Sequence, residues 1–183
     1  PEYGRAIDVE TMMKDLTMMK QANVNTVRTS HYPRQPKMYA MMDALGFYVM
    51  DEADVECHYD WIWGWRFLTK RLTSDGNWTA QYVDRNVRMV ARDRNHPCIV
   101  LWSNGNEGGW NTAIDSLFRT YDPQKRHVIH PWADFDELDT HHYPAYLTGV
   151  ARFTNGYKVF MPAEFMHGQY DQGHGAGLED FWA

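Results

Sequence analysis

Apolar side chains recur at helical spacing in four segments of the chain. In the first segment Met12, Leu16 and Met19 would share one face, and Asp8 stands before them as a candidate N-cap. The third segment ends at an Asn-His-Pro sequence, because proline cannot continue a helix. The predicted helices cover residues 8–22, 37–45, 78–94 and 112–121, and the face of the third would carry Tyr82, Val83, Val87 and Val90.

Short apolar or β-branched runs alternate with these helices and predict strands. The run 98–102 is apolar throughout, which is typical of a strand buried on both faces in a parallel sheet. Strands that alternate with helices favour a parallel α/β fold, and no change in composition marks a linker. The predicted strands cover residues 24–29, 47–56, 98–102, 127–131, 138–142 and 158–163.

Length and charge narrow the classes of protein. The 183 residues suffice for one domain with a substantial core. A net charge of −6 without a Lys/Arg run argues against nucleic acid as a partner. No apolar stretch approaches the roughly 18 residues of a membrane span, and no signal peptide is recognisable. The compartment stays open between bacterial cytoplasm and periplasm, and the chain begins with Pro1 rather than methionine.

Cysteine and aromatic content add two further points. The two cysteines, Cys57 and Cys98, are too few for a disulfide-built fold, and their spacing excludes a C-x-x-C zinc site. Several of the eight tryptophans fall in loop-like sequence. Exposed aromatic faces stack on sugar rings, so a carbohydrate site would account for them, whereas filling of the core is the alternative. These tryptophans are Trp61, Trp63, Trp65, Trp110 and Trp132.

Polar and ionisable residues cluster where the predicted strands end. In a (β/α)₈ barrel the carboxyl ends of the strands meet at one mouth, which holds the active site. Two carboxylates from different strands suit glycosidic cleavage, which needs an acid at the leaving oxygen and a carboxylate at the anomeric carbon. Ordinary solvated loop ends are the alternative. The clusters are 28–31, 51–58, 104–107, 139–143 and 163–167.

Four stretches resemble glycoside hydrolase family 2, the β-galactosidase and β-glucuronidase family. Residues 92–109, RDRNHPCIVLWSNGNEGG, resemble its acid/base signature, and residues 161–168, MPAEFMHG, resemble its nucleophile strand. Residues 18–33 and 48–58 resemble its second and third barrel strands. The resemblance implies that residues 1–183 are part of a catalytic TIM barrel, roughly strands 2 to 7. The first and last strands and the accessory β domains of the parent chain would lie outside it.

The resemblance implies a retaining double displacement by two carboxylates. Glu107 would protonate the leaving oxygen and then deprotonate the incoming water, and Glu164 would form the glycosyl-enzyme intermediate. Arg28 and Tyr143 would stabilise the Glu164 carboxylate as an anion. Further substrate contacts are implied for His31, Asn106 and His167, with Asn106 at the sugar 2-hydroxyl.

A magnesium ion is implied by the β-galactosidase branch of the family, and no organic cofactor is expected. Glu56, His58 and Glu107 would hold the ion. Glu56 and His58 are two residues apart, so on a strand both side chains would face the same way. A hydrogen-bonded pair without metal is the alternative for Glu56 and His58.

The leading hypothesis is therefore an exo-acting retaining β-glycosidase, with β-galactosides first because His167 follows Glu164 by three residues. A β-glucuronidase, another family 2 exo-β-glycosidase and a catalytically silent carbohydrate-binding barrel are the alternatives. A metal-dependent hydrolase built from the nine histidines has little support, since no H-E-x-x-H array occurs. The expected partners are a carbohydrate and the remaining domains, with a homo-oligomer left open. Six strands cannot close a barrel of eight, so the segment alone is expected to be inactive.

Overall fold

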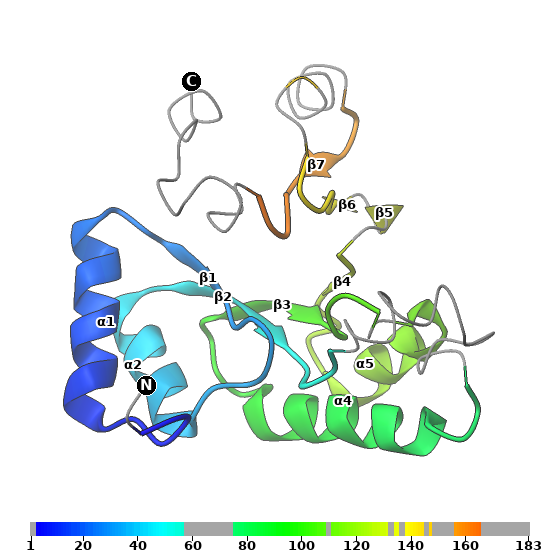
Figure 1. The fold of residues 1–183 in the computed structure, drawn as a ribbon, viewed down its shortest axis with the longest axis horizontal. Coiled ribbons are helices and arrows are strands. Elements are labelled where there is room, and N and C mark those ends of the chain that lie inside the picture. Colours follow the sequence, from blue (N-terminus) through cyan, green and yellow to red (C-terminus); the bar gives the residue numbers. More distant parts are fainter. Residues whose placement is uncertain are drawn as a thin grey trace. The chain divides into compact units, whose positions relative to one another are not determined.

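The computed structural model describes residues 3–56, 75–108, 111–131, 134–135, 138–144, 147 and 156–165. The chain forms two compact units, Pro1–Val128 and Ile129–Ala183. Figure 1 shows the first unit as strands flanked by helices and the second with short strands. Each unit carries one of the two predicted catalytic glutamates.

Parallel strands form the centre of the first unit. They are β1 (Thr26–Arg28), β2 (Tyr48–Glu52) and β3 (Ile99–Ser103). β4 (Val128–Ile129), at the boundary of the two units, is the fourth strand of the same sheet, in the order β1-β2-β3-β4. β1 pairs with β2 and β2 with β3 in parallel. Strands that are adjacent in the sheet also follow one another along the chain, with helices between them. This is the topology of a β/α barrel. The predicted α/β fold is confirmed.

Helices cover this sheet, and they begin and end for identifiable reasons. The Asp8 side chain caps α1 by accepting from the Thr11 amide at 2.7 Å, as predicted. Gly46 ends α2 in the left-handed region at φ 67°, where glycine is favoured. In Figure 1, α1 lies beside α2 and α4 beside α5. The helices are α1 (Val9–Gln21), α2 (Pro36–Leu45), α4 (Thr79–Asp93), η2 (Thr112–Ile114) and α5 (Asp115–Tyr121).

Two predictions about buried faces need correction. On α4, Tyr82 and Val90 are buried as expected, but Val83 and Val87 are only half-buried, and the polar Asn86 is buried instead. The Asn86 amide donates to the Tyr82 carbonyl at 3.0 Å, which is why burial of this amide is tolerated.

The third predicted strand is also less enclosed than its apolar sequence suggested. Val100 is 38% exposed, so β3 is not covered on both faces along its whole length. At its far end Trp102 is fully buried against Phe118 of α5, and its indole donates to the Asp122 carboxylate at 2.9 Å. Both ends of β3 are therefore buried, at Ile99 and at Trp102, and the exposed surface lies at Val100 between them.

The second unit contains a small mixed sheet. Its strands are β5 (Asp134–Phe135), β6 (Leu138–Asp139) and β7 (Val159–Phe160), in the order β5-β6-β7. β6 and β7 pair in parallel, and both were predicted. β5, which pairs with β6 in antiparallel fashion, was not predicted, because two residues carry no periodic pattern.

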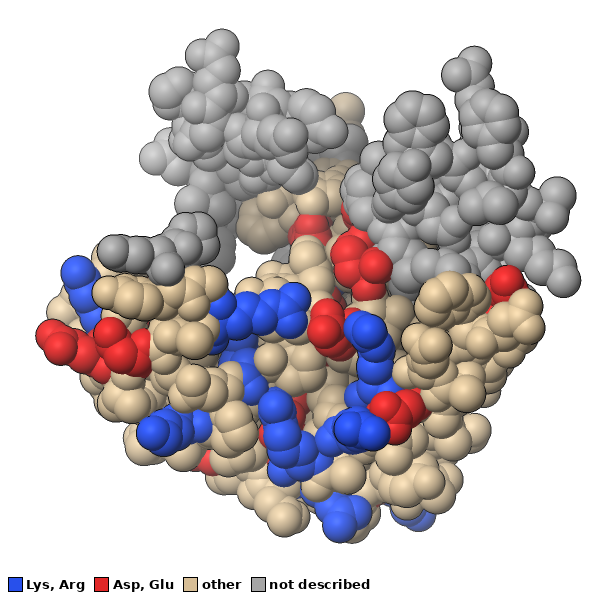
Figure 2. Space-filling model, turned by 60° about the horizontal axis from the view of Figure 1, so that its bottom comes forward, with Lys and Arg blue, Asp and Glu red and all other residues tan. Residues whose placement is uncertain are grey.

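Charges of both signs lie on the face shown in Figure 2, where carboxylates stand beside several of the lysine and arginine side chains. The described residues include ion pairs such as Arg88 with Asp84 at 2.8 Å and Arg92 with Asp93 at 2.7 Å. None of the helices described here is both long and apolar enough to span a bilayer.

Candidate active site

The carboxyl ends of β1, β2 and β3 meet around one buried carboxylate. Glu52, the last residue of β2, has no exposed surface and accepts three hydrogen bonds. Arg28 at the end of β1 donates from Nε at 2.6 Å, and the Ser103 hydroxyl at the end of β3 donates at 2.8 Å. The third contact is to His31 Nδ1 at 2.8 Å. This arrangement, the Glu52 cluster, joins all three strand ends through side chains.

Asn106 connects the Glu52 cluster to the loop after β3. Its Oδ1 accepts from Arg28 Nη2 at 2.6 Å, and its Nδ2 donates to Glu56 Oε2 at 2.7 Å. Its amide donates to the Val55 carbonyl at 2.9 Å. With both ends of its side chain and its backbone bonded, Asn106 has one orientation, and Glu107 follows it directly. Glu107 is 9% exposed.

The backbone of this loop depends on glycine and on a second anchor. Gly105 has φ 146°, a region that residues with a Cβ rarely adopt. Asn104 donates from Nδ2 to the Asp115 carboxylate and to the Asn111 carbonyl, both at 2.9 Å. Asp115 begins α5, so the Asn104 contacts tie the acid/base loop to the helix that follows it.

In the second unit, Tyr143 lies directly against Glu164. The Tyr143 amide donates to the Glu164 carbonyl at 2.8 Å, and the Tyr143 hydroxyl donates to Glu164 Oε2. His142 forms a parallel bridge with Glu164, and its Nε2 lies 3.8 Å from the same carboxylate oxygen. The pairing of Tyr143 with the candidate nucleophile therefore agrees with the geometry that the resemblance implied. The catalytic roles themselves stay predictions.

Other predicted contacts join the two units or involve residues outside the described part of the chain. Glu107 and Arg28 belong to the first unit and Glu164 to the second, so the Glu107–Glu164 separation and the Arg28–Glu164 contact stay predictions. His167, His58, Cys57 and the five loop tryptophans lie outside the described residues.

The geometric argument for the magnesium site needs correction. The predicted strand 47–56 ends at Glu52, because the Val55 amide turns back to the Ala53 carbonyl at 2.7 Å. Glu56 is therefore not on a strand, and the argument from spacing two residues apart along a strand does not apply. Among the described residues no group of three His, Cys, Asp or Glu could hold a metal. The magnesium site itself stays untested.

A second buried carboxylate lies next to Glu52 on the same strand but belongs to a different environment. Asp51 accepts from the Tyr39 hydroxyl at 2.5 Å and from the Thr29 hydroxyl at 3.1 Å. Burial, and then the charge of Asp93, raise the pKa of Asp51 well above its usual value of 3.8. Thr29 also accepts from the Glu52 amide at 2.8 Å, so one hydroxyl links Asp51 to the backbone of the Glu52 cluster.

Sequence reasoning assigned no role to Glu52, Ser103 or Asp51. Glu52 stood inside the recognised cluster 51–58, but nothing in the sequence distinguished it from its three acidic neighbours, Asp51, Asp54 and Glu56. The alternation along the predicted strand 47–56 placed Glu52 on the opposite face from Asp51, but the end of β2 at Glu52 was seen only in the structure.

Comparison with known proteins gives a consistent result. The model of a family described as glycosyl hydrolases family 2, TIM barrel domain, matches residues 1–147. The β-galactosidase of Yersinia enterocolitica is 46% identical over 128 residues, which cover 68% of this chain and 12% of that protein. A β-galactosidase of Yersinia pestis is 45% identical over the same length and coverage. The chain thus spans about an eighth of the length of these curated relatives.

Solved structures with the same fold include two bacterial β-glucuronidases. The one from Faecalibacterium prausnitzii has a TM-score of 0.60 and 26% identity, and the match covers 88% of this chain and 32% of that one. The one from Ruminococcus gnavus, in complex with D-glucuronic acid, has a TM-score of 0.67 and 22% identity, covering 90% of this chain and 32% of that one.

Proposed function

The chain belongs to glycosyl hydrolase family 2, and on that premise we propose that its parent protein is a retaining β-glycosidase acting on terminal, non-reducing β-galactosides. The choice of β-galactosides as the substrate rests on the 46% identity to the Yersinia enterocolitica β-galactosidase. The sequence supports it with His167, three residues after Glu164. We place all of residues 1–183 in the catalytic barrel, with the remaining strands and domains elsewhere in the parent chain.

The reaction proceeds in two displacements. Glu164 attacks the anomeric carbon while Glu107 donates its proton to the leaving oxygen, so the glycosidic bond breaks and a glycosyl–Glu164 ester forms. Glu107 then removes a proton from water, the water oxygen bonds to the anomeric carbon, and Glu164 leaves as a carboxylate. Two inversions give net retention. The two carboxyl groups are expected about 5–5.5 Å apart, the spacing of retaining enzymes.

The described residues orient or stabilise the two catalytic carboxyl groups in both displacements. Asn106 and the Glu52 cluster hold the loop before Glu107, and a fixed acid transfers its proton with less loss of entropy. Asn106 is also the candidate for the sugar 2-hydroxyl, and His31, held by Glu52, for another hydroxyl. On the other side, the Tyr143 hydroxyl stabilises the anionic form of Glu164, the form that attacks.

A magnesium ion is part of this proposal, and Glu56 and Glu107 are its candidate ligands among the described residues. Glu56 and Glu107 provide carboxylate oxygens, which Mg²⁺ prefers, and with His58 they would hold the ion. When bound, the ion would supply positive charge that favours the ionised form of Glu107. Removal of metal by EDTA should then change both the activity and the pH profile of the parent enzyme. An unchanged profile would remove magnesium from the proposal.

A β-glucuronidase is the second candidate, favoured by the likeness to the Faecalibacterium prausnitzii β-glucuronidase. The deciding experiment is a panel of nitrophenyl glycosides tested on the full-length parent protein. We expect the β-galactoside to have the highest kcat/KM. Turnover of the β-glucuronide alone would move the proposal to the second candidate. A folded protein that cleaves none of the glycosides would be a silent carbohydrate-binding barrel. Whether the full-length protein assembles into a homo-oligomer stays a prediction, which the molar mass of the same protein preparation in solution would test.

A further inference from the structure

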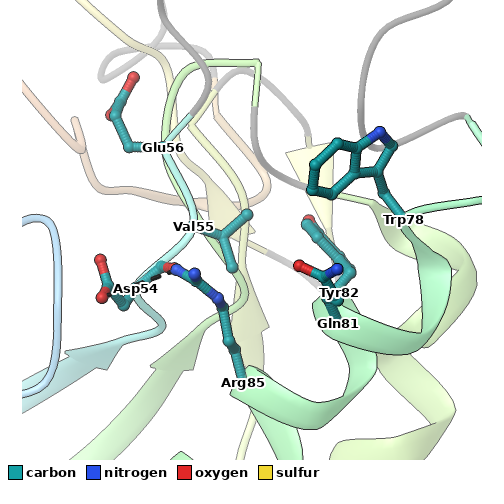
Figure 3. A pocket seen from close by; sticks show the side chains of 7 residues that line it. All are labelled: Asp54, Val55, Glu56, Trp78, Gln81, Tyr82 and Arg85. Carbon is teal, nitrogen blue, oxygen red and sulfur yellow. Dashed lines mark hydrogen bonds and ion pairs between the residues drawn. The ribbon is translucent and has the colours of Figure 1, made fainter.

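A pocket of about 160 Å³ lies between the loop after β2 and the first turns of α4. Figure 3 shows that its walls come from both elements. An engineered cavity of roughly 150 Å³ accepts benzene, so this space matches one six-membered ring. The lining residues are Asp54, Val55, Glu56, Trp78, Gln81, Tyr82 and Arg85.

The lining combines an apolar base with a polar rim. Val55 and Tyr82 are almost fully buried at the base, whereas Trp78 is 44% exposed and offers its indole to the opening. Asp54, Gln81 and Arg85 add acceptors and donors around it. Apolar walls with a few polar groups are typical of small-molecule sites, and an indole face with hydroxyl-binding neighbours suits a sugar ring.

The pocket is connected to the candidate acid/base loop by two hydrogen bonds. Asn106 Nδ2 donates to Glu56 Oε2 at 2.7 Å, and the Asn106 amide donates to the Val55 carbonyl at 2.9 Å. Glu56 and Val55 thus line the pocket and also contact the residue before Glu107. All of these residues belong to the first unit, so their arrangement does not depend on the second.

The loop is also held to α4, so the pocket has a defined shape. Arg85 Nη1 donates to the Asp54 carbonyl at 2.5 Å and lies 3.6 Å from the Asp54 carboxylate. A preformed pocket binds with less ordering cost than a loop that must first close.

We propose that this pocket is a leaving-group subsite that binds one sugar ring by stacking on Trp78, with Gln81 hydrogen-bonding a hydroxyl. The proposal rests on the proposed function, because an acid/base glutamate protonates the leaving group and the pocket adjoins its loop. It names the substrate class on that side as a disaccharide or longer β-galactoside, rather than a galactoside with a small alkyl group.

The test compares two substrates in the full-length protein. Lactose has a sugar leaving group, and methyl β-galactoside has a leaving group too small to reach an indole. An aromatic contact is worth a few-fold in affinity, so Trp78→Ala should lower the ratio of kcat/KM for lactose to that for methyl β-galactoside by about 2- to 10-fold. Gln81→Ala should lower the same ratio by less. The matched control is Tyr121→Ala, another exposed aromatic, at the end of α5 and outside the pocket lining.

A second measurement separates failure of the pocket from failure of the proposed function. Free glucose, the lactose leaving group, is titrated while tryptophan fluorescence is followed in wild type and Trp78→Ala. A glucose-dependent change that the variant loses supports the pocket even if no galactoside is cleaved. An unchanged substrate ratio in a protein that cleaves both galactosides would overturn the pocket and leave the proposed function standing. Loss of lactose selectivity in Tyr121→Ala as well would also overturn it.

Discussion

Glu107 and Glu164 are expected to share one reaction, yet the structure holds them in different ways. The loop of Glu107 follows β3, a five-residue strand within the sheet β1-β2-β3-β4, and its neighbour Asn106 is 2% exposed. Glu164 follows β7, a two-residue strand, and its partner Tyr143 is 38% exposed. The Glu107 loop is therefore fixed by a buried polar network, whereas Glu164 is held by a hydrogen bond from the partly exposed Tyr143, with buried His142 at 3.8 Å.

This difference predicts where distant substitutions matter. A hydrogen bond to a buried, charged group contributes more than one at the surface, because water cannot replace a lost partner. Changes to the supports of Glu107 should therefore reduce turnover more than changes to the supports of Glu164. Changes to the two glutamates themselves should exceed both.

The largest effects are expected from the two glutamates. Glu164→Ala in the parent enzyme should reduce kcat by at least about 10⁴-fold on every substrate, because no nucleophile remains. Glu107→Ala should reduce kcat by about 10²- to 10⁴-fold on alkyl galactosides but far less on nitrophenyl galactosides, whose leaving group needs no acid.

Added azide distinguishes the two variants by stereochemistry. Azide should rescue Glu107→Ala with formation of a β-galactosyl azide, and Glu164→Ala with formation of an α-galactosyl azide, as identified by NMR. Exchanged products would mean that the two roles are reversed.

A smaller effect is expected from Glu52, the buried hub of the acid/base side. In Glu52→Gln the amide nitrogen faces either the Arg28 and Ser103 donors or His31 Nδ1, and the negative charge that pairs with Arg28 is lost, so the orientation of Arg28 and His31 is weakened. Loss of such an outer support typically costs about 10- to 100-fold in activity, and we expect kcat/KM to fall by that factor. Asp84→Asn, at an exposed carboxylate of α4, is the matched control.

Glu52 is a positioning residue only if it acts through the residues that it holds. In a double-mutant cycle with His31→Ala, the two effects should then combine to less than their product. If the two substitutions instead multiply in their effect on kcat/KM, and Glu52→Gln also lowers the melting temperature, Glu52 has only a structural role. The contrast between the supports of Glu107 and those of Glu164 would then be weaker.

On the nucleophile side, Tyr143→Phe removes the hydroxyl that donates to Glu164 and keeps the aromatic ring. Because Tyr143 is partly exposed, water can replace the lost donor, and we expect kcat to fall only about 10-fold. The measurement is steady-state turnover of methyl β-galactoside, a substrate that needs the acid, alongside Glu52→Gln. A larger loss in Tyr143→Phe than in Glu52→Gln would contradict the comparison.

The smallest effect on turnover is expected from Asp51, whose role is in stability. Its pKa is raised above 3.8 in the folded state, first by burial and then by the charge of Asp93. At a pH between 3.8 and the folded-state pKa, Asp51 is therefore protonated in the folded protein and ionised in the unfolded chain. The stability from this group is thus fully present below about pH 3.8 and is lost as the pH rises through the folded-state pKa.

Asp51→Asn keeps an acceptor for Tyr39 and Thr29 but cannot ionise. We therefore expect this variant to gain stability relative to wild type as the pH rises above 4, measured by urea unfolding at several pH values, with kcat little changed. Asp84→Asn serves again as the control. A parallel pH dependence in wild type and Asp51→Asn would show that Asp51 does not titrate there.

The sequence predicted the elements of both units better than their details. Helical spacing with an Asp8 cap, and strands that alternate with helices, led to the correct α/β class, because these patterns are local. The two-residue β5 was missed for want of a pattern, and β2 was extended too far because acidic residues after Glu52 keep the alternation that a strand would show.

In the candidate site, too, residues within local motifs were predictable, whereas a residue defined by partners far away in sequence was not. The resemblance supplied Glu107, Glu164 and the Tyr143 contact, since these residues stand in recognisable motifs. It did not single out Glu52, whose importance comes from three partners that lie 21, 24 and 51 residues away in sequence. Such a convergence depends on how three strands align, and spacing along one chain does not reveal it.

The central claim is that Glu164 becomes covalently bonded to the sugar, and labelling tests it most directly. A 2-deoxy-2-fluoro-β-galactosyl fluoride reacts with a retaining nucleophile but is released slowly, because the fluorine destabilises the positively charged transition state. Mass spectrometry of the digested parent enzyme should find one fluorogalactosyl group on the peptide that contains Glu164, and none in Glu164→Gln. A label on another residue, or an active enzyme that acquires no label, would contradict the account.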